Sequence, residues 1–112
     1  MTVETLPDDG GVRVLRATGE VDVTVVPALL ADVASMVAGA SGVVLDLTPA
    51  TFFDSSGVRL VDRLSRECGR TSTPFRVAAP PGSPGRRVLE LVGMARLLAD
   101  DDLATALGRV RA

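Results

Sequence analysis

The sequence of 112 residues contains no histidine, and because all 12 of its basic residues are arginine, it contains no lysine either. Histidine is the commonest general base and metal ligand, and lysine is required for a Schiff base or a phosphate-loop motif. Ser-His-Asp and Cys-His catalysis therefore cannot be assembled from this chain, and any catalysis would depend on carboxylates alone. These absences argue against an enzyme, and we assign no catalytic residue, no metal site and no cofactor.

Charge and hydropathy exclude further classes of protein. The net charge is −2 and there is no basic block, so nucleic acid is not expected as a partner. No apolar run reaches the roughly 18 residues that a membrane span needs, and residues 1–9 lack the pattern of a signal peptide. We therefore expect a cytoplasmic protein without direct membrane contact. The single Cys68 cannot form an internal disulfide, and its place on the apolar stripe of a predicted helix indicates a buried structural thiol.

Strand and helix patterns alternate along the chain after an opening hairpin. The turn of this hairpin is predicted at Asp8-Asp9-Gly10-Gly11. We expect strands over residues 2–6, 12–21, 43–47, 75–79 and 97–98, and helices over about residues 24–37, 57–70, 83–93 and 103–110. This order predicts an α/β fold in a single domain over residues 1–112, with a mixed sheet of four to five strands and about four helices packed against it.

Acidic residues occur at three places where a site could be built. Asp46 ends a strand, but a phosphotransferring aspartate would need a second Asp at Thr48 or a lysine elsewhere, so a plain strand-end role is favoured. Glu20 and Asp22 share one face of an extended segment without a third ligand, which indicates a surface role. The run at residues 100–102 complements the dipole of the helix that follows, and three adjacent side chains do not converge on a metal.

The most informative segment joins an apolar strand to an amphipathic helix through Asp54-Ser55-Ser56-Gly57. Two hydroxyls therefore lie where the first unpaired amides of a helix point outward, and a helix N-terminus favours negative charge. Ser55 or Ser56 is thus a candidate phosphorylation switch. The alternative is that one serine only caps the helix, although a pair is redundant for capping.

Three motifs, in this order, resemble one known family. They are Gly19-Glu20-Val21-Asp22, the segment 44–57 that ends in Asp54-Ser55-Ser56-Gly57, and the segment 87–93. Together they resemble the signatures of a STAS domain of the anti-sigma factor antagonist type. The resemblance covers essentially the whole chain.

The resemblance implies a partner-switching protein. An anti-sigma factor that is also a serine kinase would bind the antagonist and phosphorylate it with ATP, the phosphorylated form would let go, and a serine phosphatase would restore it. The unmodified form would capture the anti-sigma factor and free the sigma factor. Ser56 matches the family's phosphate acceptor; Ser55 would support it, and Asp54 and Gly57 would shape the site.

Four residues are expected at the partner-binding surface. Asp22 matches a family loop residue near that surface, and Glu20 precedes it. Arg59 and Arg63 lie on the outer face of the helix after Gly57, which we interpret first as a solvated face and second as a docking surface. Arg59 departs from the family, which usually carries a small residue there; its guanidinium could pair with a phosphate on Ser56 or crowd the partner.

Three other functions stay open on the sequence. The chain could be a STAS accessory subunit of a membrane lipid transporter, or a binding module that is not phosphorylated. It could also be a small-molecule or nucleotide sensor, although the sequence has no phosphate-cradling loop. The serine pair favours the switch, because a structural clamp needs no phosphorylatable pair. No long apolar edge or heptad repeat demands a dimer, so we expect a monomer when the protein is free.

Overall fold

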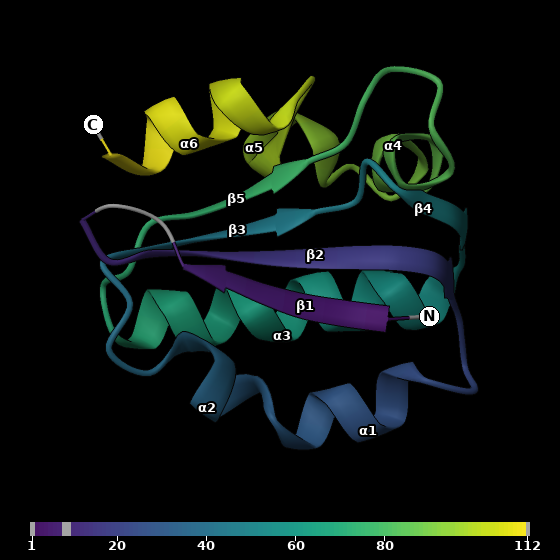
Figure 1. Cartoon of the computed structure of the whole chain (residues 1–112). Coiled ribbons are helices and arrows are strands. Elements are labelled where there is room, and N and C mark those ends of the chain that lie inside the picture. The colour runs from purple at the N-terminus through teal and green to yellow at the C-terminus, as the bar shows by residue number, and fades with distance from the viewer. Residues whose placement is uncertain (1, 8–9, 112) are drawn as a thin grey trace.

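The computed structural model describes residues 2–7 and 10–111 and contains one mixed sheet with helices on both faces (Figure 1). The strands are β1 (Thr2–Pro7), β2 (Val12–Val21), β3 (Gly42–Asp46), β4 (Ala50–Phe53), β5 (Phe75–Ala78) and β6 (Ala99–Asp100). The helices are α1 (Val26–Ala31), α2 (Val33–Val37), α3 (Ser55–Arg70), α4 (Pro84–Leu91), α5 (Ala95–Leu98) and α6 (Leu103–Arg111). The predicted α/β class is confirmed.

The sheet has the strand order β1-β2-β3-β5-β6, and β4 pairs separately with β2. β1 and β2 form the predicted antiparallel hairpin, whereas all other pairs are parallel. Of the predicted turn, Asp8 and Asp9 lie outside the described residues, and Gly10 and Gly11 both have a φ of 85°, which favours glycine. The sheet has six strands instead of the predicted four to five. The additional strand is β4, whose four residues are too few to give a clear pattern in the sequence, and the two-residue strand β6 lies just after the predicted strand at residues 97–98.

Two layers of side chains bury the central strands. All residues of β3 are buried, as expected for a parallel strand that is covered on both faces. One cluster packs strand residues against the helices below the sheet in Figure 1, and its members include Leu15, Leu45, Val77, Leu60, Leu64 and Cys68. The other packs strand residues against α6 and consists of Val12, Val44, Ala78, Ala106 and Val110.

The predicted helix over residues 24–37 is divided at Asp32. The amide of Asp32 donates to the carbonyl of Leu29 at 2.9 Å, which closes a tight three-residue turn instead of a full α-helical turn. Asp32 also accepts at its carbonyl a bond from the hydroxyl of Ser35, at 2.9 Å. The Ser35 hydroxyl thus bonds to a backbone carbonyl at the break. Apolar periodicity carries no information on such a local bond, so it predicted one continuous helix.

The predicted edge strand at residues 97–98 is wrong. These residues end α5, where the amide of Leu98 donates to the carbonyl of Met94 at 3.1 Å, and the edge strand β6 follows at Ala99–Asp100. A short apolar run cannot be assigned to helix or strand from periodicity alone. The neighbouring β5 decides the outcome, because it pairs Val77 with Ala99.

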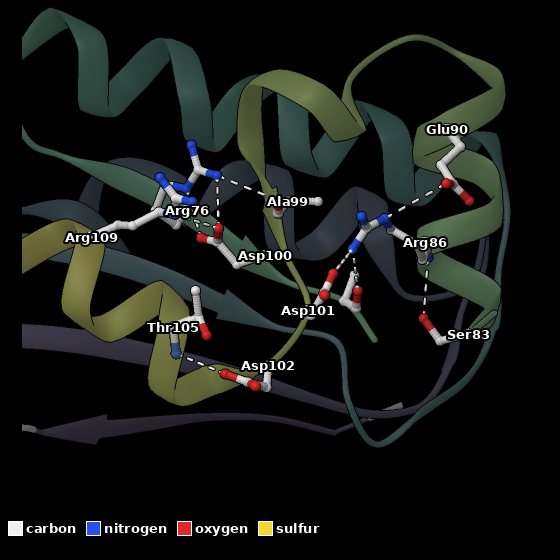
Figure 2. A network of polar contacts seen from close by, with 11 residues as sticks. Arg76, Ser83, Arg86, Glu90, Ala99, Asp100, Asp101, Asp102, Thr105 and Arg109 are labelled. Carbon is white, nitrogen blue, oxygen red and sulfur yellow. Dashed lines mark hydrogen bonds and ion pairs between the residues drawn. The ribbon is translucent and has the colours of Figure 1, made fainter. Parts of the chain in front are cut away.

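The acidic run after α5 does more than complement a helix dipole, and its three carboxylates point to different elements (Figure 2). Asp100 is only 5% exposed and pairs with Arg76 of β5 at 2.8 Å and with Arg109 of α6 at 2.6 Å. The neighbouring Asp101 pairs with Arg86 of α4 at 2.9 Å. Only Asp102 acts at the start of α6, where it accepts a bond from the amide of Thr105 at 2.8 Å. The run therefore fastens β6 and α6 to the rest of the fold.

Candidate functional site at the start of α3

The N-cap of α3 is Asp54, not a serine. Asp54 has extended backbone angles, and its Oδ1 accepts a hydrogen bond from the amide of Ser56 at 2.8 Å. This is the geometry of a side-chain cap. Among the residues that the structure describes, neither the hydroxyl of Ser55 nor that of Ser56 has a hydrogen-bond partner. The capping alternative for the serines is therefore wrong, and both hydroxyls are unoccupied.

Gly57 allows the preceding strand to pack against the first turn of the helix. Phe53 is the last residue of β4, and its side chain is buried. A Cβ atom at position 57 would stand 2.5 Å from Cε2 of the Phe53 ring, which is closer than real atoms approach. The absence of a side chain at residue 57 is thus a packing requirement. It allows the first turn of α3, which carries both serines, to lie directly against the Phe53 ring.

The parallel pairing of β2 with β4 brings two of the sequence motifs together. Glu20 lies opposite Phe52, and Val21 lies opposite Phe53. The segment that contains Glu20 and Asp22 consequently ends beside the start of α3. Sequence reasoning did not predict this pairing, because it did not predict β4.

Two exposed apolar side chains belong to the segments around Asp22 and before Asp54, and the sequence analysis missed both. Phe52 is 47% exposed and Val23 is 66% exposed. Large exposed apolar residues are informative where they gather near polar residues. The available signal was the Phe52-Phe53 pair, of which only one ring can face the core in a strand.

Asp22 shapes the turn that leads into α1. Its Oδ1 accepts hydrogen bonds from the hydroxyl and from the amide of Thr24, the latter at 3.0 Å. Both bonds lower the pKa of Asp22 below its ordinary value, and the bond from the hydroxyl has the larger effect. With its pKa lowered, Asp22 is ionised at neutral pH, which suits a binding surface.

The outer face of α3 carries the two other predicted partner-binding residues. Arg59 and Arg63 are exposed, and neither forms an ion pair within the described part of the chain. Asp62 and Arg66, one turn apart on this helix, form an ion pair at 2.9 Å. Glu67 pairs with Arg70, and the hydrogen bond from Arg70 lowers the pKa of Glu67.

Two groups that could have suggested chemistry are structural. Asp46 is 3% exposed, pairs with Arg16 at 3.3 Å and accepts a bond from the amide of Thr48 at 3.0 Å, so the strand-end role is confirmed. Cys68 is buried, as predicted, and burial raises the pKa of its thiol to about 11. A thiol with this pKa is inert at neutral pH.

No helix in residues 2–7 and 10–111 has the length and apolar character that crossing a membrane requires.

Comparison with known proteins identifies the family. The model of the STAS domain matches residues 5–107. The anti-sigma-F factor antagonist RsfB of Mycobacterium tuberculosis is 34% identical over 91 residues, which cover 80% of this chain and 73% of that protein. The crystal structure of an anti-sigma factor antagonist from Mycobacterium paratuberculosis superposes with a TM-score of 0.85 at 31% identity, over 99% of this chain and 96% of the other. Unphosphorylated SpoIIAA shares the fold, with a TM-score of 0.81 at 23% identity over 98% and 96% of the two chains. The chain belongs to the STAS domain family, among the anti-sigma factor antagonists.

Proposed function

We propose that this protein is an anti-sigma factor antagonist whose capture of its partner is controlled by phosphorylation of Ser56. The unphosphorylated form binds an anti-sigma factor with serine kinase activity and frees the sigma factor. The relatives named above support the antagonist role, since the two that are more than 30% identical carry that name. The observation that carries the switch is the hydroxyl of Ser56 in the first turn of α3, which has no hydrogen-bond partner among residues 2–7 and 10–111.

The position of Ser56 suits a reversible modification. Because Asp54 already caps the helix, esterification of the Ser56 hydroxyl removes no hydrogen bond from the fold. In the kinase complex, Oγ of Ser56 attacks the γ-phosphorus of ATP, the bond to ADP breaks, and a base of the kinase takes the hydroxyl proton. A phosphatase then hydrolyses the ester with water. The antagonist supplies no catalytic group, and we regard it as a substrate and not an enzyme.

Electrostatics favour release of the partner over a change of fold. A phosphate adds a charge of about −1.5 to −2 at neutral pH. At the start of a helix this charge is worth roughly 0.3–1 kcal/mol in favour of the folded state. In a docked interface, a like charge or an unpaired desolvated one costs several kcal/mol. The interface term is larger, so phosphorylation releases the partner without refolding the antagonist.

The partner-binding surface extends over three elements around Ser56. It combines the exposed apolar side chains of Val23 and Phe52 with the acidic Glu20 and Asp22. On α3 it continues to Arg59 and Arg63, with Ser55 beside the acceptor. Protein–protein interfaces commonly combine such apolar and charged side chains. We place this surface on a single STAS domain of residues 1–112 that is a monomer when free and acts in the cytoplasm.

Site-resolved phosphopeptide mass spectrometry tests the switch on protein isolated from its own cells under growth and stress conditions. We expect phosphate on Ser56, with an occupancy that changes with the condition. Ser56→Ala should bind the anti-sigma factor constitutively and Ser56→Asp should bind it at least tenfold more weakly. Ser55→Ala is the matched control and should leave the modification of Ser56 intact. Absence of phosphate from both serines in every condition would refute the proposal.

A further inference from the structure

Arg59 is an exposed cation one turn after the serine pair. No residue in the described part of the chain forms an ion pair or hydrogen bond with it. Residues three and four positions apart are neighbours on a helix surface. Toward the C-terminus of α3, the neighbours of Arg59 are Arg63, which has the same charge, and Asp62, which is already paired with Arg66 at 2.9 Å.

Helix geometry directs Arg59 toward Ser56. The two positions are three residues apart, so their Cβ atoms are about 5–6 Å from each other. Side chains of an α-helix lean toward its N-terminus, so the Arg59 side chain extends over the turn that carries Ser56. Asp54 lies on the other side of Ser56 in the chain, and its carboxylate accepts a hydrogen bond from the amide of Ser56 at 2.8 Å. A phosphate on Ser56 would be repelled by Asp54 and attracted by Arg59.

We propose that Arg59 binds a phosphate on Ser56 of the same chain through charge-assisted hydrogen bonds from its guanidinium to the phosphate oxygens. This inference rests on the proposed function, because it concerns the phosphorylated form. Arg59 draws the phosphate away from Asp54 and stabilises its dianion. Phosphorylation then alters two charges of the partner-binding surface at once: it adds the phosphate, and it withdraws Arg59 from the contact with the partner.

The pKa of the phosphate reports this contact directly. Phosphoserine is incorporated at position 56 during translation, so that no kinase is needed, and the second pKa of the phosphate is measured by ³¹P NMR. Arg59→Gln should raise this pKa by roughly 0.3–0.7 pH units, because a neutral side chain no longer stabilises the dianion. Asp54→Asn keeps a capping side chain but removes the repelling charge, so it should lower the same pKa.

Arg63→Gln is the matched control on the same helix face. Position 63 is seven residues beyond position 56, about 10 Å along the helix axis, so its guanidinium does not reach the phosphate. We expect the Arg63→Gln protein to have the pKa of the parent. In addition, the Nε–H resonance of Arg59 should move when Ser56 is replaced by phosphoserine, whereas that of Arg63 should not.

Two results would overturn the inference. The first is an equal phosphate pKa in the parent and in Arg59→Gln. The second is an equal effect of Arg59→Gln and Arg63→Gln, which would mean that only the general charge of the helix matters. Failure of the proposed function would be recognised by a different result, namely the absence of phosphate from Ser56 in cells. That result leaves the measurement on incorporated phosphoserine unchanged.

Discussion

The ring of Phe53 lies against the backbone of Gly57, at the place where any other residue would carry its Cβ atom. Phe53 belongs to the core and Gly57 to the first turn of α3. This contact joins strand β4 to the helix that bears both candidate serines. The geometry of the site is therefore coupled to the packing of the core.

Gly57→Ala should destabilise the protein by about 1–3 kcal/mol, because the added methyl group overlaps the Phe53 ring and the ring is buried. Urea denaturation at neutral pH measures this loss. Gly69→Ala in the same helix is the control. The space around Gly69 is open, so alanine should be neutral or stabilise by up to about 1 kcal/mol through its higher helix propensity. Equal effects at both positions would show that the ring contact is unimportant.

Asp54 should be replaceable by asparagine but not by alanine. Its carboxylate caps α3 through the amide of Ser56, and asparagine offers an oxygen in the same place. Asp54→Ala should therefore cost about 1 kcal/mol of unfolding free energy, whereas Asp54→Asn should cost no more than a few tenths. Thermal unfolding of the three proteins at one concentration makes the comparison. If asparagine destabilises as much as alanine, the charge of Asp54 and not its cap is the stabilising element.

Asp100→Asn should be among the most destabilising single changes in the C-terminal part of the chain. Asp100 is buried between Arg76 and Arg109, and its neutralisation leaves the largely buried guanidinium of Arg76 without a counter-charge. We expect a loss of about 2–4 kcal/mol in chemical denaturation. Asp101→Asn, at the adjacent exposed position that pairs with Arg86, should cost less than about 1 kcal/mol. Similar losses for the two variants would contradict the buried network.

Alkaline pH should weaken the fold through Cys68. Its pKa rises from 9.0 when unfolded to about 11 in the folded chain, so the folded state favours the neutral thiol. The resulting stability is complete below pH 9 and is lost as the pH rises through about 11. Lysine and tyrosine are absent, so no other side chain is expected to titrate in this interval.

Urea denaturation at several values between pH 8 and pH 11 checks this expectation. In a Cys68→Ala protein the decline of stability over the same interval should disappear, even though the truncation itself lowers stability at every pH. A decline that persists in the alanine variant would assign the alkaline sensitivity to another cause.

The residue types of the candidate site were predictable from the sequence, but the hydrogen bonds between them were not. The Asp54-Ser55-Ser56-Gly57 motif follows an apolar strand and precedes a 3.6-residue periodicity, and these local patterns suffice to place hydroxyls at a helix start. Which residue caps the helix was not predictable, because aspartate and serine are about equally good caps. The structure assigns the cap to Asp54 and thereby leaves both hydroxyls free.

Local periodicity by itself determined most elements of this protein. Strand β2 has its predicted bounds, and the buried face of α3 is the predicted one, because alternation and helical spacing are properties of neighbouring residues. Only the tertiary structure decided the position of β4 beside β2, which brings Glu20 opposite Phe52. It also decided the burial of Asp100 between two arginines from distant elements. Pairing between segments far apart in the chain depends on the side chains of both segments together, as Val21 and Phe53 show by pairing and sharing the core, and no short window of sequence contains that information.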